Sequence, residues 1–356
     1  MKFRPQSIVY NNDLLSARRS MGDPLADVLI QTTFKSTEYK VELRAWLDSL
    51  TDNSVLSTDK TPFQQYPLVV QSQLLPVWAE KKQMARGTAF FNRYSDKIMS
   101  LLGLLSLPYC YAASRGAMVL YLSERMRADP QKRLLETAEF VWDVMDPDAF
   151  TGKGRGFSSI LKVRLMHAAV RYYTLASGKW DDSWGMPVNQ EDMAGTNLSF
   201  SLIVVRGLRK FGIAVSYDEQ QAFMHLWNVI GSMLGVQEDL LPQEGKQAIQ
   251  LEELIRERQF EPSEQGRALT RSLTGYFSSV ATGAPFSAKE IFQVMRYLLG
   301  DPVADILEIA SPGLPPDKIR LLKLANSFSL PGFLQNSGTN YDTNYRKFKQ
   351  EMLMLG

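Results

Sequence analysis

The chain has 356 residues, of which 45% are hydrophobic, so it can bury a substantial core in one large domain or two smaller ones. The formal net charge is only +2 and no dense run of lysine and arginine occurs, which argues against a nucleic-acid-binding protein. The single cysteine, Cys110, cannot form an internal disulfide, which is typical of a reducing compartment.

The N-terminal residues 1–23 lack the apolar core and small-residue cleavage site of a secretory leader, so we expect a cytoplasmic location. The longest uncharged stretch, residues 98–114, contains Gly103 and Pro108. It is shorter than the roughly 20 apolar residues that a membrane-spanning helix needs. We therefore predict no transmembrane segment and expect a buried helix pair or a channel wall there. Peripheral membrane contact stays open.

Residues 1–75 are typical of short helices and loops, and the helical pattern becomes regular later. Asp129 can cap a helix that has Pro130 at its first position and ends near Met145. A glycine-rich loop follows at residues 152–156. It does not follow a predicted strand, as a phosphate-binding loop would, so we expect a simple connection.

The next helix can be capped by Ser158 or Ser159 and can end near Gly178. The remaining helical patterns run from Asn189, with Asp192 at the third position, to Gly212; from Ser216, with Glu219 completing a capping box, to Gly235; and over residues 248–258, 287–299 and 316–325. Residues 332–356 are polar and aromatic and predict a tail.

Strand patterns are scarce, so the sequence predicts an all-α fold. We divide the chain into an N-terminal extension of helices and loops at residues 1–75 and a central core at residues 76–260. The C-terminal helices and the polar tail, residues 261–356, are expected to pack on that core as part of one compact unit.

His167 is the candidate metal ligand. The chain has only two histidines, His167 and His225, and no HExxH or CxxC motif, which excludes a centre built from several imidazoles. A haem iron needs only one imidazole from the protein. Val163, Met166, His167 and Val170 share one apolar helix face, so His167 could ligate such an iron. A satisfied core histidine is the alternative.

Arg164 and Arg171 lie seven residues apart on an adjoining face of the same predicted helix. Such a pair could bind two haem propionates through charge-assisted, bidentate hydrogen bonds. A pair that faces solvent is the alternative. His225 lies off the apolar stripe of its own helix, which favours a structural role for it.

Three blocks in this order resemble the latex-clearing-protein (rubber oxygenase, MpaB-type oxygenase) family: KVRLMHAAVR at residues 162–171, PVNQEDMAGT at 187–196 and HLWNVIG at 225–231. The resemblance is good over about residues 110–245. It implies a globin-like helical core with additional peripheral helices around a b-type haem, with His167 as the proximal ligand of the iron.

The resemblance also implies catalytic residues near the haem. The family's threonine thirty residues before the histidine is Thr137 here, and the arginine four residues earlier is Arg133. These two share one helix face. In the polyisoprene-cleaving members a lysine directly before the threonine can ligate the distal iron, whereas this chain has Glu136. The replacement removes that ligand and adds a carboxylate.

Together these residues predict a haem b-dependent oxygenase that uses O₂ on a C=C bond of a small apolar substrate, for example an isoprenoid. Bulk rubber is a poor candidate because a cell does not take up that polymer. A peroxide-using haem enzyme, with Glu136 as the proton-transfer group, is the alternative enzyme. A non-catalytic carrier of haem or of an apolar ligand, and a helical interaction protein without haem, also stay open.

Overall fold

The computed structural model describes residues 9–58, 60–123, 129–280, 287–309, 312–327 and 341–355. In chain order its helices are α1 (Asn12–Arg19), α2 (Pro24–Thr33), α3 (Thr37–Ser49), α4 (Asn53–Thr58), α5 (Pro67–Gln71), α6 (Lys81–Leu101), α7 (Leu107–Tyr111), α8 (Ser114–Leu122), α10 (Pro130–Met145), α11 (Gly156–Ala176), α12 (Gln190–Phe200), α13 (Leu202–Lys210), α14 (Tyr217–Met233), α15 (Gly245–Gln259), α16 (Glu264–Val280), α17 (Ala288–Leu299), α18 (Asp301–Ile306), α19 (Pro316–Ser327) and α20 (Tyr341–Leu355). Short 3₁₀-helices are η1 (Pro62–Gln65), η3 (Asp182–Trp184) and η4 (Glu238–Leu240), and η2 (Leu102–Ser106) is a π-helix. Within the described residues, pairing of the strand type is limited to one isolated bridge, between Ala113 and Phe260. The all-α prediction is confirmed.

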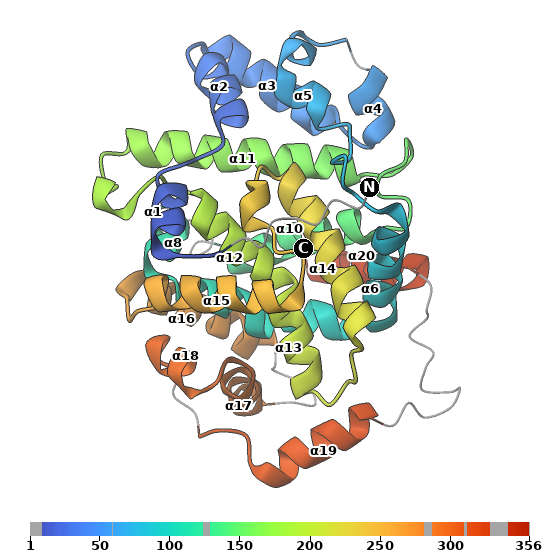
Figure 1. Cartoon of the computed structure of the whole chain (residues 1–356), viewed down its shortest axis with the longest axis vertical. Helices are drawn as coiled ribbons and strands as arrows, with labels where there is room; N and C mark the ends of the chain where they lie inside the picture. The colour runs from blue at the N-terminus through green and yellow to red at the C-terminus, as the bar shows by residue number, and fades with distance from the viewer. Residues whose placement is uncertain are drawn as a thin grey trace.

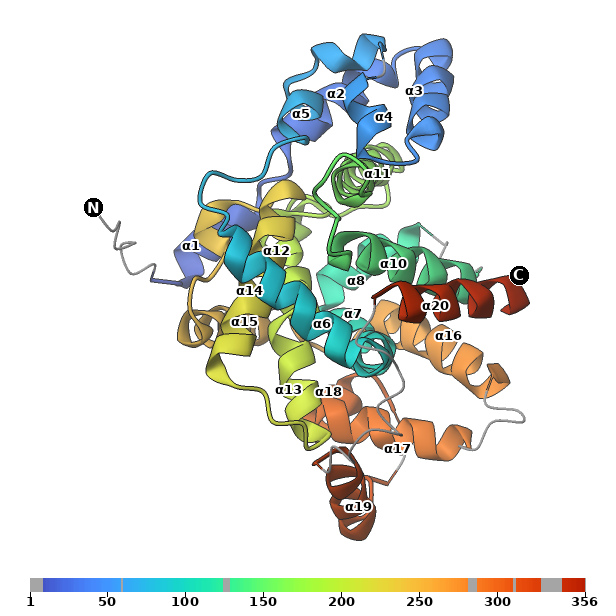
Figure 2. The same cartoon turned by 90° about the vertical axis from the view of Figure 1, so that its right-hand side faces the viewer.

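Helices α2 to α5 form a layer that covers one side of α11, as both views show (Figure 1, Figure 2). The apolar residues of this layer pack against the back of α11 in one buried cluster that includes Leu29, Ile30, Leu43, Trp46, Leu161, Leu165 and Ala168. The other side of α11 faces the main body of the protein. Helix α11 is therefore held between the N-terminal layer and the core.

The uncharged stretch at residues 98–114 lies inside the main core. It forms the end of α6, the π-helix η2 and the short helix α7, and Ile98, Leu101 and Leu105 are buried there. Helix α14 packs along α6 in the same core (Figure 2). The expected buried helices are confirmed. Of the helices that the structure describes, none is both long and apolar enough to cross a membrane.

The prediction of a tail at residues 332–356 is wrong for residues 341–355, which form helix α20, and its other residues lie outside the described residues. Its aromatic residues Tyr341, Tyr345 and Phe348 recur at helical spacing and gather around Trp142 of α10. The Tyr341 hydroxyl also donates to the Trp142 carbonyl at 2.8 Å. Helix α20 therefore packs beside α10 (Figure 2).

Two predicted helices agree with the structure at their caps. Asp129 accepts from the Lys132 amide at the start of α10, and Ser216 with Glu219 forms a complete capping box at the start of α14. Gly235, which follows α14, has a φ of 95° that favours glycine. These caps are local, so the sequence alone specifies them.

Helix α11 begins at Gly156, three or four residues earlier than a cap at Ser158 or Ser159 predicts. One amide of its first turn is satisfied by a distant residue instead. The side-chain oxygen of Asn53 in α4 accepts from the Ser158 amide at 3.1 Å, while its amide group donates to the carbonyls of Ala149 and Thr151 at 2.8 and 2.6 Å. The prediction failed because this cap is a tertiary contact.

The single helix predicted from Asn189 to Gly212 is two helices. Asn189 does cap α12, but Ser201 interrupts the run with φ −112° and ψ −80° before α13 begins. Ser201 therefore separates α12 from α13, which follow one another through the bundle (Figure 1). Neither glycine nor proline marks this position in the sequence.

Candidate active site

A cavity of about 320 Å³ lies in the helical core. Residues of α7, α8, α10, α11, α12, α14 and α15 line it, and most of the lining surface is apolar. The apolar lining includes Leu107, Phe140, Val163, Val170, Phe200 and Trp227. A large apolar cavity with a few polar groups is typical of a site for an apolar ligand.

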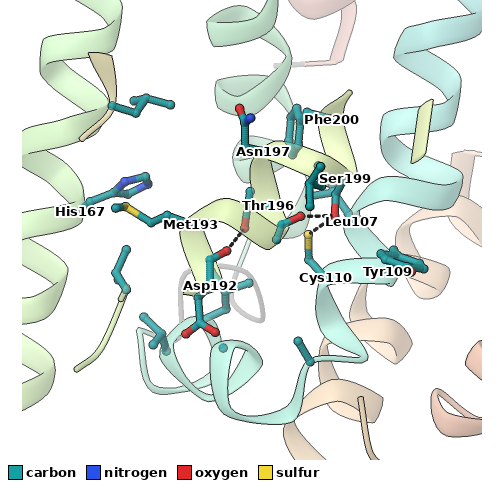
Figure 3. Close-up of a pocket in the computed structure, with 18 of the residues that line it drawn as sticks. Leu107, Tyr109, Cys110, His167, Asp192, Met193, Thr196, Asn197, Ser199 and Phe200 are labelled. Atoms are coloured by element: carbon teal, nitrogen blue, oxygen red, sulfur yellow. Dashed lines mark hydrogen bonds between the residues drawn. The ribbon is translucent and has the colours of Figure 1, made fainter. Parts of the chain in front are cut away.

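His167 lines this cavity from α11, and Figure 3 shows its ring extending toward α12 on the facing side. Its Nδ1 atom is buried and has no hydrogen-bond partner among the described residues. Burial, together with the positive charges of Arg171 and Arg133, lowers the pKa of His167 to about 4. The imidazole is therefore neutral near pH 7, which is the form that ligates a metal.

These properties fit a haem. A haem needs one neutral imidazole, apolar walls around the macrocycle and an opposite side open to small molecules. Val163, Met166 and Val170 surround His167 on the cavity face of α11, as the periodicity predicts. The orphaned Nδ1 atom is the one departure, because a ligating histidine usually donates its second ring N–H to an acceptor.

The three predicted residues of α10 lie in the same cavity. Arg133, Glu136 and Thr137 all line it together with His167. The Arg133 guanidinium contacts the Glu136 carboxylate at 3.3 Å, and both side chains are about one quarter to one third exposed (23% and 35%). The Thr137 hydroxyl donates to the Arg133 carbonyl at 2.9 Å. The arginine–carboxylate pair thus combines access to the cavity with access to solvent.

Arg164 and Arg171 are engaged elsewhere and neither lines the cavity. The Nε and Nη2 atoms of Arg164 contact both carboxylate oxygens of Asp23, at 2.5 and 2.9 Å. Arg171, whose side chain is only 2% exposed, contacts Asp27 at 2.6 Å and donates to the Val188 carbonyl at 3.1 Å. In place of the predicted propionate clamp, both arginines join α11 to the N-terminal segment.

His225 also has a structural environment. Its Nε2 atom accepts from the backbone amide of Glu80, the residue that precedes α6, at 2.9 Å. Its ring lies against Trp78, with a distance of 5.8 Å between the ring centroids. His225 does not line the cavity. The structure therefore supports the structural role that its position in the sequence favours.

The block at residues 187–196, to which the sequence assigned no chemistry, joins several segments. The Gln190 side chain donates to the carbonyls of Gly22 and Gly235, at 2.8 and 2.9 Å. The fully buried Glu191 carboxylate contacts Arg19 at 3.3 Å and Arg258 at 2.8 Å. These contacts fix the position and rotation of α12 in the cavity wall.

Sequence reasoning missed the polar residues that α12 presents to the cavity. Asp192, Thr196 and Ser199 follow helical spacing and all line it (Figure 3). The Cys110 thiol of α7 lies opposite Ser199, with 3.3 Å between the sulfur and the hydroxyl oxygen. The spacing was visible in the sequence, but nothing there indicated that this face of α12 adjoins a cavity.

The cavity lining also includes the buried carboxylate of Glu252. Glu252 of α15 is only 3% exposed and accepts a hydrogen bond from the Tyr109 hydroxyl. Arg206 and Arg256 contact the same carboxylate at 2.5 and 3.2 Å. Burial and the neighbouring Glu252 charge raise the pKa of Tyr109. Tyr109 therefore stays protonated and donates to Glu252.

Comparisons with known proteins agree with this architecture. Residues 93–326 match the family of the ER-bound oxygenase mpaB/B′ and rubber oxygenase catalytic domain. The rubber oxygenase of Streptomyces sp. (strain K30) is 29% identical over 239 residues, which are 66% of this chain and 58% of that protein. The chain thus spans less than two thirds of that relative. The solved structure of latex clearing protein LCP in the closed state shares the fold, with a TM-score of 0.75 and 24% identity over 93% of this chain and 90% of that one.

Proposed function

This chain belongs to the mpaB/B′ and rubber oxygenase family, and on that premise we propose that it is a haem b-dependent oxygenase. Its substrate would be a small apolar molecule with a C=C bond, such as an isoprenoid, and its oxidant O₂. The observation that carries the proposal is the neutral imidazole of His167 in a largely apolar cavity, inside the family's catalytic region. A bound haem would supply the activation of oxygen.

The residues of this chain would divide the remaining tasks. His167 would hold the iron, and the apolar side chains of Val163, Met166 and Val170 would exclude water around the macrocycle. Glu136 would hold or release a proton at its carboxylate, with Arg133 keeping that group oriented. Thr137 has its hydroxyl hydrogen committed to the Arg133 carbonyl, so it would offer an oxygen lone pair.

The test of the iron ligand is the absorption spectrum of protein made with ample haem. The parent protein should show a Soret band with about one haem per chain, and acidified organic solvent should extract the haem because no CxxCH motif attaches it. His167→Ala should lose the haem or change the spectrum strongly. His225→Ala is the matched control and should leave the Soret band in place. Folded parent protein without haem, or the reverse behaviour of the two variants, contradicts the assignment.

A peroxide-using enzyme is the second candidate, and the pairing of Arg133 with Glu136 at the cavity favours it. A carboxylate beside a guanidinium can move a proton between the two oxygens of a peroxide. Glu136→Gln keeps the shape and removes the charge. Glu139→Gln on the same helix is the control, because Glu139 pairs with Lys349 and does not line the cavity.

A role of Glu136 at the haem predicts a changed iron spin state, a changed affinity for azide or cyanide, or a changed pH dependence of activity. The Glu139 variant should match the parent in all three measurements. If the Glu136 variant also matches the parent in all three, the peroxide candidate loses its basis. Consumption of O₂ or of peroxide in the presence of substrate then separates the two enzyme types.

A further inference from the structure

The cavity is not uniformly apolar, because α12 presents oxygen atoms along one of its faces. Asp192 and Thr196 lie one helical turn apart and both line the cavity (Figure 3). Thr196 is exposed although most of the α12 residues around it are buried. We call Asp192 and Thr196 the oxygen pair of α12. A bound molecule would meet this pair on the side of the cavity that faces His167.

Both members of the oxygen pair are acceptors. The hydroxyl hydrogen of Thr196 is committed to the carbonyl of Asp192, at 2.9 Å, so its oxygen can act only as an acceptor, toward the neighbouring Cys110 thiol and toward the cavity. Next along the helix, Ser199 likewise donates to the Gly195 carbonyl at 2.9 Å and receives the Cys110 thiol. The hydroxyl groups of this face therefore have no hydrogen left to donate to a ligand.

The Asp192 carboxylate also accepts on both oxygens. Arg19 donates to one oxygen at 3.0 Å, and the Asn189 side chain donates to the other at 2.8 Å. Burial raises the pKa of Asp192, while these two donors favour the charged form. Each carboxylate oxygen offers about two acceptor positions and accepts one of these hydrogen bonds, so capacity remains for a further donor from the cavity.

We propose that the substrate is an apolar molecule that carries a hydrogen-bond donor, such as an alcohol or a phenol, and that the oxygen pair of α12 accepts this donor. This inference rests on the proposed function, because it names the class of molecule that the oxygenase would take. A bare hydrocarbon would cover the carboxylate and the hydroxyl without replacing their hydrogen bonds to water, which is costly. An ether or ester could offer only an acceptor oxygen to the oxygen pair of α12, so no hydrogen bond would form.

The test compares farnesol, farnesyl methyl ether and the corresponding hydrocarbon as ligands, with dissociation constants from isothermal titration calorimetry. The parent protein should bind farnesol about tenfold more tightly than the other two, which is the effect of one hydrogen bond to a charged or polar acceptor. Thr196→Val keeps the side-chain shape and should weaken farnesol binding about fivefold, while the hydrocarbon should bind at least as tightly as it does to the parent protein. Asp192→Asn should reduce the same preference.

The control is Thr274→Val in α16, because Thr274 also donates to a carbonyl of its own helix, at 2.8 Å, but does not line the cavity. It should keep the parent's preference. Equal binding of the three probes by the parent, or an unchanged preference in folded Thr196→Val, overturns the proposal. Haem content is read separately from the absorption spectrum. If the protein contains haem but does not prefer farnesol, this inference is wrong and the proposed function stands. If the protein lacks haem but prefers farnesol, the proposed function is wrong and this inference stands.

Discussion

Replacement of Arg164 by methionine should destabilise the fold rather than release haem directly. Arg164 contacts both oxygens of Asp23 and also donates to the Met233 carbonyl at 3.1 Å. The two side chains are only 11% and 4% exposed. The variant would therefore leave a buried carboxylate without its cation and a carbonyl without its donor.

Breaking a buried pair by removing one partner typically costs 3–5 kcal/mol, and the residual exposure of Arg164 places the expected loss at the lower end, about 3 kcal/mol. The entropy of unfolding of 356 residues is about 0.75 kcal/mol per kelvin, so the melting temperature should fall by about 4 °C. Asp23→Asn should give a loss of similar size. The double variant should cost less than the sum of the two, by about 2 kcal/mol.

The assay is urea unfolding followed by circular dichroism, combined with the rate of haem transfer to an acceptor protein. The control is Arg44→Met, because the pair of Arg44 with Asp48 at 3.9 Å is highly exposed and should contribute less than about 1 kcal/mol. If Arg164→Met releases haem faster at unchanged stability while Asp23→Asn behaves like the parent, Arg164 binds a propionate and the structural reading is refuted.

Three further predictions follow from other contacts. Burial lowers the pKa of His167 from 6.5 to about 4, so the haem-free protein should lose stability as the pH falls through this window, and urea titrations of His167→Gln should show a smaller dependence, with the part due to the buried His225 remaining. Asn53→Ala breaks buried hydrogen bonds at the start of α11, including that to Ser158, and should cost about 3 kcal/mol in chemical unfolding. Tyr341→Phe removes the hydrogen bond to Trp142 and should cost about 1 kcal/mol; an unchanged midpoint would mean that α20 contributes nothing through this bond.

The sequence predicted those parts of the fold that depend on near neighbours. Asp129 and Ser216 cap their helices through residues only three positions away, so both caps could be predicted. The start of α11 depends on Asn53, which lies more than 100 positions earlier, so the local sequence does not predict that contact. Helix α20 differs from the predicted tail because its polar composition indicates a tail, whereas the helical spacing of its aromatic residues indicates a helix.

The same distinction applies to the candidate site. The apolar periodicity of α11 predicts that Val163 and His167 share one face, and both line the cavity. The family resemblance predicts that Arg133 and Thr137 lie near His167, and both line the same cavity. The two faces of α11 differ in a way that periodicity does not reveal. Arg164 lies one turn before His167 in the sequence yet contacts the N-terminal segment, since its partner Asp23 comes from a distant part of the chain.

The position of α2 to α5 has a practical consequence for shortened forms of this protein. The family match begins at residue 93, so trimming to the matched region is an obvious design. Such a chain would uncover Leu161, Leu165 and Ala168, which are at most 1% exposed, and would leave Arg164 without its acid. An exposed apolar surface on α11 would promote self-association of the shortened protein. The recognised family segment is therefore smaller than the unit that must be expressed, and residues from α1 onward should be retained in any truncation or fusion.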